Sequence, residues 1–182
     1  MAIRCCSKVS KHYQTPETAI QQEWASGLSL RITNVYGPGP KSSSGDRGVL
    51  NAAIKKALQG EELLIYGSGE YLRDYIYIDD VIFCFLSAPM HIKKMNGRHF
   101  VLGSGVGATV KDAILLVGRL VHEVTGMSVP IRYMEPPNAF SRIEFREFVA
   151  NTTALRNLFG PETSCSLDDG IKKAIDYIIR GE

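Results

Sequence analysis

The stretch that most constrains the fold is residues 63–81, LLIYGSGEYLRDYIYIDDV, in which two apolar runs flank a glycine turn. The first run covers residues 63–66 and stops at Gly-Ser-Gly, residues 67–69, where two glycines can adopt positive φ. The second run alternates between two sides as a strand does. It leads to Asp79 and Asp80, either of which can cap a helix that runs through the apolar residues after them. The stretch therefore predicts strand, turn, strand and helix.

Arg73 and Asp74 lie where this turn gives way to the second strand. A guanidinium beside a glycine turn and several tyrosines suits a phosphate or diphosphate, because its planar donors can form two parallel hydrogen bonds to one anion. The alternative is an Arg–Asp ion pair on the surface at the end of a strand. The residues alone leave both interpretations open.

Composition limits the class of protein. With 182 residues, 45% of them hydrophobic, the chain can bury one sizeable core. A net charge of +2, without a run of lysines or arginines, gives no reason to expect nucleic acid. No apolar stretch approaches the roughly 20 residues needed to cross a bilayer, and the start lacks the apolar region of a signal peptide. The four cysteines lack metal-ligand spacing and indicate reduced thiols in a cytoplasmic protein: Cys5, Cys6, Cys84 and Cys165.

Strands alternate with helices along the chain, which predicts an α/β fold. The expected strands, besides the two already described, are residues 28–33, 99–102 and 130–134. The expected helices, besides the one after Asp80, are residues 15–26, 48–58, 109–124, 152–159 and 166–179. Residues 34–40 contain two prolines and two glycines and are expected to form a loop. We expect residues 1–15 to be an irregular segment and residues 16–182 to form one domain.

One glycine cluster imitates a dinucleotide-binding loop. Gly103-x-Gly105-x-Gly107 follows an expected strand and precedes an expected helix. Its third glycine comes one residue early for G-x-G-x-x-G, and the acid near the expected distance, Glu123, falls in the same helix. We therefore expect an ordinary strand-to-helix turn. The sequence has no other dinucleotide fingerprint and no motif with metal-ligand spacing, so no metal site is expected.

The order of the motifs resembles the NAD-dependent epimerase/dehydratase family, the extended short-chain dehydrogenases that act on nucleotide sugars and include UDP-glucose 4-epimerase-like enzymes. Three segments carry the resemblance: LRITNVYGPG at 30–39, LLIYGSG at 63–69 and RDYIYIDDV at 73–81. Weaker pieces keep the family order: residues 100–110, 151–160 and 166–171. The resemblance covers about residues 17–180. It implies the C-terminal part of a doubly wound Rossmann-type fold, together with the small substrate-binding subdomain.

The resemblance also implies substrate-binding residues. Asn34 and Arg73 match the positions that contact the diphosphate of the nucleotide sugar, and Leu64 and Tyr66 match those that line its base. The chemistry of the residues alone gives Asn34 a role in the turn and Tyr66 a role in strand packing. Two further matches lie in a stretch that aligns loosely. They are Arg142, for a second diphosphate arginine, and Glu144, for the acid that binds ribose hydroxyls.

The catalytic segment departs from the family pattern. The family's Tyr-x-x-x-Lys should lie at about residues 5–17, where Tyr13 is the candidate tyrosine and Glu17 stands four residues later instead of lysine. The lysine lowers the pKa of the tyrosine from its ordinary value of about 10, whereas a glutamate would raise it. NAD is the implied cofactor, but the glycine-rich βαβ unit that holds it in the family is not encoded. We therefore expect a C-terminal half that is inactive alone.

Two other possibilities stay open at this point: a non-catalytic protein that binds a sugar nucleotide, and a truncated product that binds nothing. The expected ligand is a UDP-sugar or a similar nucleotide sugar. The expected strand at residues 28–33 would normally be flanked by strands that this chain does not encode. An unpaired apolar strand favours self-association, so we expect a homodimer or association through an exposed sheet edge.

Overall fold

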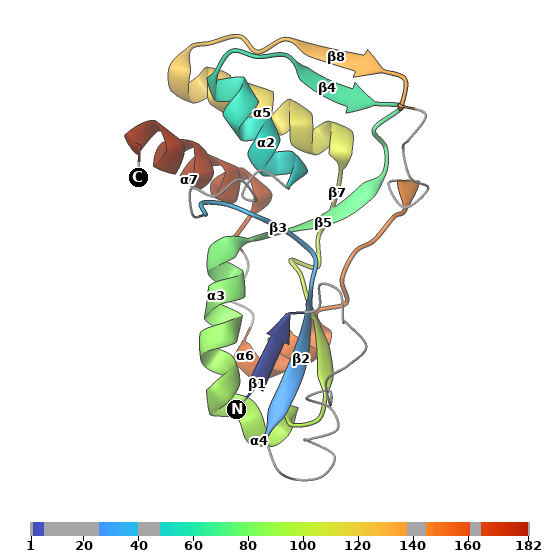
Figure 1. Ribbon diagram of the computed structural model, residues 1–182, viewed down its shortest axis with the longest axis vertical. Helices are drawn as coiled ribbons and strands as arrows, with labels where there is room; N and C mark the ends of the chain where they lie inside the picture. Colours follow the sequence, from blue (N-terminus) through green and yellow to red (C-terminus); the bar gives the residue numbers. More distant parts are fainter. Residues whose placement is uncertain (1, 6–25, 40–47, 138–144, 161–164, 182) are drawn as a thin grey trace, which may run out of the picture.

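Three small sheets organise the part of the chain that the structure describes, residues 2–5, 26–39, 48–137, 145–160 and 165–181 (Figure 1). In this computed structural model the first sheet is parallel and contains, in spatial order, β1 (Ala2–Cys5), β2 (Gly27–Ile32) and β6 (His99–Leu102). The second contains β3 (Asn34–Tyr36), β5 (Leu72–Tyr77) and β7 (Gly107–Thr109), with β5 parallel to β3 and antiparallel to β7. The third pairs β4 (Leu63–Tyr66) with β8 (Ile131–Met134) in parallel.

The helices divide between two halves of the molecule (Figure 1). The lower half in the figure holds the first sheet with α3 (Ile78–Ser87), a 3₁₀ helix (Ala88–His91), α4 (Ile92–Met95) and α6 (Thr153–Phe159). The upper half holds the third sheet with α2 (Val49–Leu58), α5 (Val110–Thr125) and α7 (Leu167–Arg180). Strands β3 and β5 run between the halves. None of the described helices is both long and apolar enough to cross a bilayer.

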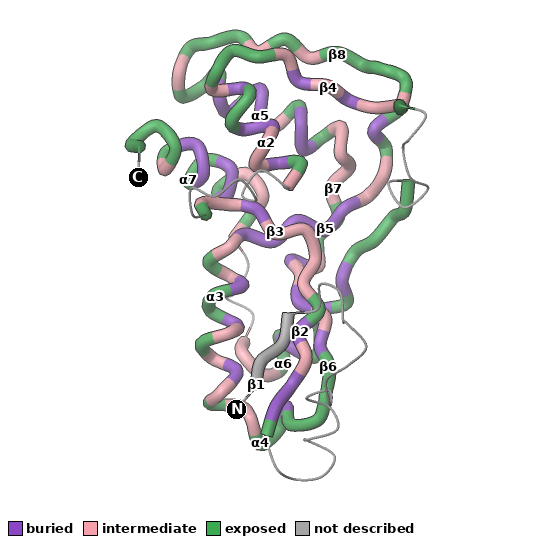
Figure 2. The backbone as a smooth tube through the Cα atoms, viewed as in Figure 1, coloured by how far each residue is buried: buried purple, intermediate pink, exposed green. Residues whose placement is uncertain are grey.

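Each half has its own buried core (Figure 2). On β2 the alternate residues Leu28 and Leu30 are buried, and the register places Leu30 beside the buried Phe100 of β6. This face of the sheet packs against Val81 and Cys84 of α3. Burial of a side chain such as Leu30 contributes about 1.5–3 kcal/mol to folding. The α/β fold class expected from the alternation of strands and helices is confirmed.

Local sequence signals set the ends of several helices. The Thr109 hydroxyl accepts a hydrogen bond from the Asp112 N–H at 2.9 Å and begins α5, while Gly126, with φ of 75°, ends it. The Ser166 hydroxyl likewise accepts from the Asp169 N–H at 3.1 Å and begins α7. These contacts span three residues, so they act before any tertiary packing. The predicted caps of these two helices are confirmed, and each helix ends one residue beyond its predicted end.

The prediction of an irregular N-terminal segment is wrong for residues 2–5. These residues form β1 and pair in parallel with residues 27–30 of β2. These four residues contain no apolar run that would predict a strand, and they form one by pairing with the edge of β2. The rest of the segment, the division at residue 15 and the helix expected at 15–26 fall mostly within residues 6–25, outside the described residues.

The expectation that the strand at residues 28–33 lacks neighbours is also wrong. It is β2, the central strand of its sheet, and it is paired along both edges, with β1 and with β6. The outer edges of the described sheet therefore belong to β1 and β6. Association through a sheet edge stays a prediction, but its place moves to these two strands.

Two smaller expectations are corrected as well. The loop expected at residues 34–40 begins with β3, because Asn34–Tyr36 pair with Tyr75–Tyr77, and the interruption comes at Gly37, with φ of 124°. Neither Asp79 nor Asp80 caps α3, since the helix begins at Ile78, directly after the strand, with Tyr77 at the N-cap. A carboxylate oxygen of Asp80 instead accepts the Cys165 N–H at 2.9 Å.

Tyr36 joins β3 to α7. The residue is 2% exposed, and its ring packs edge-on against Tyr77 at 5.6 Å between ring centroids. Its hydroxyl lies 3.4 Å from the Leu167 carbonyl oxygen, at the start of α7. A Cβ atom added at Gly170 would overlap this hydroxyl and lie 2.8 Å from Cζ of the ring. The close approach of α7 to the tyrosine therefore requires glycine at residue 170.

We expect Gly170→Ala to destabilise the fold by about 1–3 kcal/mol, because the buried ring of Tyr36 cannot move aside without disturbing Tyr77. Helix propensity alone predicts the opposite sign, a gain of about 1 kcal/mol. Urea unfolding monitored by circular dichroism measures the difference.

Gly118→Ala is the matched control for this prediction. Gly118 is a buried helical glycine whose added Cβ would meet the end of the Ile131 side chain at 3.1 Å. We expect it to be near neutral. A Gly170→Ala variant as stable as the Gly118→Ala variant would contradict the packing argument.

Candidate functional site

Two of the predicted substrate residues lie on paired strands of the second sheet, between the two halves of the molecule. Asn34 is the first residue of β3 and stands opposite Tyr75 of β5, two positions beyond Arg73. The side-chain amide of Asn34 donates a hydrogen bond to the main-chain carbonyl oxygen of Asp74 at 2.9 Å. The fold therefore brings Asn34 to the strand segment that carries Arg73.

Arg73 is almost completely buried, with 7% of its surface exposed. Its Nη1 donates hydrogen bonds to the main-chain carbonyl oxygens of Leu72, at 3.1 Å, and of Arg146. The alternative of a surface ion pair with Asp74 is therefore wrong. The guanidinium instead fastens the segment around residue 146 to β5.

Asp74 has no exposed surface and binds four donors at 2.7–3.0 Å. One carboxylate oxygen accepts the N–H and the hydroxyl of Ser104, and the other accepts the N–H groups of Gly105 and Ala150. The Thr33 hydroxyl lies at 3.4 Å from the first oxygen. A buried carboxylate needs such partners to offset its lost hydration. Sequence reasoning missed this role, and the available signal was an acid inside an apolar strand.

The glycine loop after β6 provides hydrogen-bond donors to this carboxylate. A Cβ atom at Gly103 would lie 2.7 Å from an Asp74 oxygen and 2.6 Å from the Ala150 Cβ, so only glycine fits there. The N–H groups of Ser104 and Gly105, which a phosphate-binding loop would offer to its ligand, are bound to Asp74. The loop does not fit a dinucleotide pyrophosphate. The prediction of an ordinary turn is confirmed, although the loop also enters the short strand β7, which the sequence did not predict.

The predicted base-binding residues lie on β4. Leu63 and Ile65 are buried in the upper core, while Leu64 and Tyr66 alternate with them and are half-buried. In the register Leu64 stands beside Arg132 of β8, and Tyr66 beside Met134. Tyr66 directly precedes the glycine turn, in which Gly67 and Gly69 have positive φ as predicted. Leu64 and Tyr66 thus lie on the face of β4 that turns away from the core.

Three other predicted residues, Tyr13, Arg142 and Glu144, fall outside the described residues. Glu17, which replaces the expected lysine, does so too. The ring of Phe145, the first described residue after them, packs edge-on against Tyr71 at 5.1 Å between centroids. The following segment approaches β5, where the Phe148 N–H donates to the Leu72 carbonyl oxygen at 3.2 Å.

Buried tyrosines line the junction between the halves, and burial decides their acidity. Burial raises the pKa of Tyr75 to about 12, against a smaller opposing effect of Arg73, and it raises the pKa of Tyr36 as well. For Tyr77, burial and the nearby Asp79 raise the pKa to about 12. All three phenols therefore stay protonated near neutral pH, which makes them donors and packing groups instead of bases.

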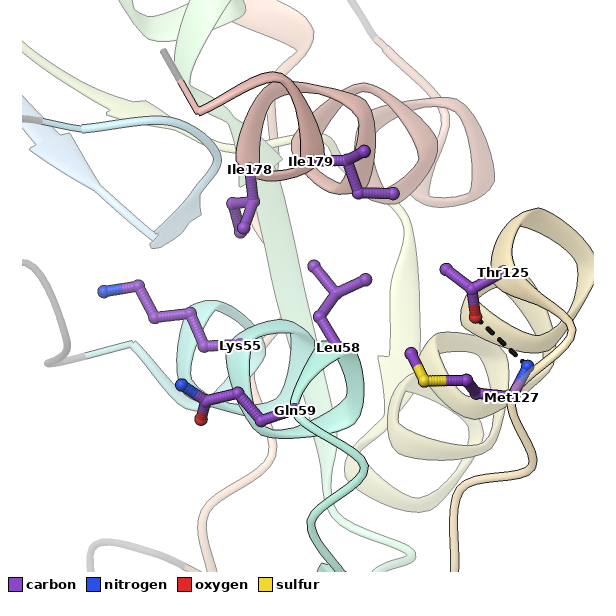
Figure 3. Close-up of a pocket in the computed structure, with 7 residues that line it drawn as sticks. All are labelled: Lys55, Leu58, Gln59, Thr125, Met127, Ile178 and Ile179. Atoms are coloured by element: carbon purple, nitrogen blue, oxygen red, sulfur yellow. Dashed lines mark hydrogen bonds between the residues drawn. The ribbon is translucent and has the colours of Figure 1, made fainter.

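A hollow of about 640 Å³ lies away from these residues, between the C-terminal ends of α2, α5 and α7 (Figure 3). Its lining is mainly apolar and contains one charged side chain: Lys55, Leu58, Gln59, Thr125, Met127, Ile178 and Ile179. No pair of acid and base groups meets in it. Across the described ranges, no group of three His, Cys, Asp or Glu side chains is placed to hold a metal ion. The junction around β3 and β5 is therefore the candidate site.

Comparison with known proteins shows the family to which the chain is similar. The model of the NAD dependent epimerase/dehydratase family matches residues 6–103. The UDP-N-acetyl-alpha-D-glucosaminuronate decarboxylase of Bacillus cytotoxicus is 28% identical over 81% of this chain and 44% of its own length. The UDP-glucose 4-epimerase of Mycolicibacterium smegmatis is 27% identical over 79% of this chain and 42% of its own length.

Among solved structures, the UDP-glucose 4-epimerase of Thermotoga maritima with UDP-glucose superposes with a TM-score of 0.70. It is 30% identical, and the match covers 90% of this chain and 51% of that chain. The chain thus spans less than half the length of the two curated relatives and about half of the solved enzyme.

The raised pKa of Tyr75 predicts a loss of stability at high pH. Below pH 10 the phenol is protonated in both states, but between about pH 10 and 12 it ionises in the unfolded chain first, which favours unfolding. The full effect is at most about 2–3 kcal/mol for one tyrosine. Urea unfolding at pH 9 and at pH 11.5 should show a smaller loss for Tyr75→Phe than for wild type. Equal losses in the two proteins would contradict the burial argument.

Proposed function

Because the chain belongs to the NAD dependent epimerase/dehydratase family, we propose that it binds a nucleotide sugar and takes part in an epimerase- or dehydratase-type conversion of that sugar. The observation that carries the proposal is the juxtaposition of Asn34 and Arg73 on the paired strands β3 and β5. A UDP-sugar is the proposed ligand class, because the named relatives act on or bind such compounds.

The proposed contacts follow the chemistry of the two parts of the ligand. Arg73 and Asn34 bind the diphosphate, the first through charge-assisted hydrogen bonds and the second through its amide N–H. Leu64 and Tyr66 contact the base from the face of β4 that turns away from the core. This division suits a ligand that lies along the start of β3, the end of β4 and the start of β5.

The remaining contacts are proposed from the sequence. Arg142 would add a second guanidinium to the diphosphate, and Glu144 would accept hydrogen bonds from the ribose hydroxyls. Both residues precede Phe148 and Ala150, which are fastened to β5 through Leu72 and Asp74. That anchoring supports the proposal by keeping the end of the segment beside the candidate site.

NAD appears in the name of the family. The described loop that most resembles a dinucleotide loop, residues 103–107, does not fit a pyrophosphate, because its first N–H groups are bound to Asp74. Among the residues that the structure describes, we assign none to NAD. Tyr13 stays the candidate for the family's catalytic tyrosine.

A second candidate function is binding without catalysis. The observation that favours it is Glu17, which stands where the family has a lysine four residues after the tyrosine. A negative charge there would raise the pKa of Tyr13 and weaken it as a base. Conversion of UDP-glucose by the purified chain with added NAD, followed by chromatography of the sugar nucleotides, separates catalysis from binding alone.

Calorimetric titration with UDP tests the proposal. We expect Arg73→Lys to weaken UDP binding by about tenfold, because lysine keeps the charge but loses the paired donors. UDP should bind more tightly than UMP, and uridine most weakly, if the diphosphate is the main determinant. Thermal melts of both proteins must accompany the titration, since Arg73 also binds two main-chain carbonyl groups.

Arg119→Ala is the control. Arg119 is an exposed arginine of α5 that pairs with Glu123 and Asp168, so its loss should leave UDP affinity unchanged. Absence of UDP binding by the folded wild-type chain would overturn the proposed ligand class. Equal weakening by Arg73→Lys and Arg119→Ala would show non-specific attraction of the anion.

A further inference from the structure

Consecutive residues of β5 fasten one distant segment, residues 146–150, along the candidate site. Arg73 donates to the carbonyl oxygen of Arg146, Leu72 accepts from the Phe148 N–H at 3.2 Å, and the carboxylate of Asp74 accepts from the Ala150 N–H at 3.0 Å. One contact uses the main chain of β5 and two use its side chains, and together they hold residues 146–150 against the strand. The position of Arg73 is therefore coupled to that of Asp74 through a shared segment as well as through the main chain.

Asp74 also joins the first sheet to the second. Its carboxylate binds the loop after β6 through Ser104 and Gly105, and it lies within reach of Thr33 at the end of β2. Its own main-chain carbonyl oxygen accepts the side-chain amide of Asn34 at 2.9 Å. Asp74 thus binds the loop after β6 and residue 150 through its carboxylate, and the amide of Asn34 through its main-chain carbonyl oxygen.

We infer that Asp74 is a positioning residue: its buried carboxylate fixes the placement of Asn34 and Arg73 for a diphosphate. The inference rests on the proposed function of those two side chains. Asp74 itself has no exposed surface and all its short contacts are to protein donors, so it acts through its neighbours and not on the ligand.

The hydrogen-bond geometry requires a carboxylate at residue 74. Each of its two oxygens accepts two donors at 3.0 Å or less. An asparagine at this position would offer one accepting oxygen and one donating amino group. In one orientation its amino group faces the N–H groups of Gly105 and Ala150, and in the other it faces the Ser104 N–H, so at least one bound donor loses its acceptor. Asp74→Asn therefore keeps the shape of the side chain but disrupts its hydrogen bonds to the loop after β6 and to Ala150.

The experiment compares Asp74→Asn with Ile175→Ala, which removes a fully buried side chain of α7 in the upper core and keeps the network of Asp74 intact. UDP affinity is measured by calorimetry at a temperature at which circular dichroism shows every variant folded. We expect Asp74→Asn to weaken UDP binding by tenfold or more and Ile175→Ala by less than about threefold, whatever their melting temperatures. Equal affinities of Asp74→Asn and wild type would overturn the inference.

Ser104→Ala keeps the inference testable if Asp74→Asn does not fold. It removes one hydroxyl donor and leaves the carboxylate with its three N–H partners. We expect a smaller loss of UDP affinity, about threefold to tenfold, with a change in melting temperature no larger than that of Ile175→Ala. An unchanged affinity for folded Ser104→Ala would count against positioning by this network.

Hydrogen exchange gives a readout that needs no ligand. In Asp74→Asn, or in Ser104→Ala to a lesser degree, the amides of residues 34–36 and 146–150 should exchange faster, while Ile175→Ala should leave them unchanged. Absence of UDP binding by wild type would refute the proposed function, and the exchange data would then still decide the positioning role. Unaltered exchange at both segments in the folded variants would overturn it.

Discussion

The buried carboxylate of Asp74 is the constraint on which the rest of the structure depends. A charge with no exposed surface is costly unless each lone pair is bound, and here four short hydrogen bonds come from two segments of the chain. The requirement fixes the loop after β6, forces glycine at residue 103 and places Ala150 against β5. The parallel sheet and the second sheet are thus held together by a polar contact in addition to apolar packing. Such a network is worth more than its separate bonds, because every donor depends on the same two oxygens.

Much of the fold could be predicted because many of its signals are local. The caps of α5 and α7 join residues three apart, and the glycine turn at residues 67–69 needs only its own backbone conformation. The strands β1, β3 and β7 were missed because their three or four residues contain no apolar run, and each pairs with a longer strand. Their existence is a property of the partner strand as much as of their own sequence.

The residues of the candidate site could be named from the sequence, but their contacts in the fold could not. Asn34 and Arg73 stood out through motif order and chemistry, and the fold places them on paired strands. The burial of Arg73 could not be foreseen, because its partner carbonyl at Arg146 lies 73 positions away along the chain. The same holds for Asp74, whose partner Ala150 lies 76 positions away. An acid beside an arginine suggests an ion pair, and the tertiary fold shows that Arg73 donates to main-chain carbonyl groups while Asp74 accepts from three N–H groups and the Ser104 hydroxyl.

The contact between Tyr36 and Gly170 has a mechanical consequence. The second sheet, β3, β5 and β7, lies between the upper and lower halves of the molecule (Figure 1). Because the ring of Tyr36 is wedged against α7 as well as Tyr77, rotation about these strands would have to separate a close-packed contact. This packing sets the position of β3 relative to α7. A nucleotide sugar bound at Asn34, as proposed, would then meet a strand that is already held in place, which lowers the ordering cost of binding.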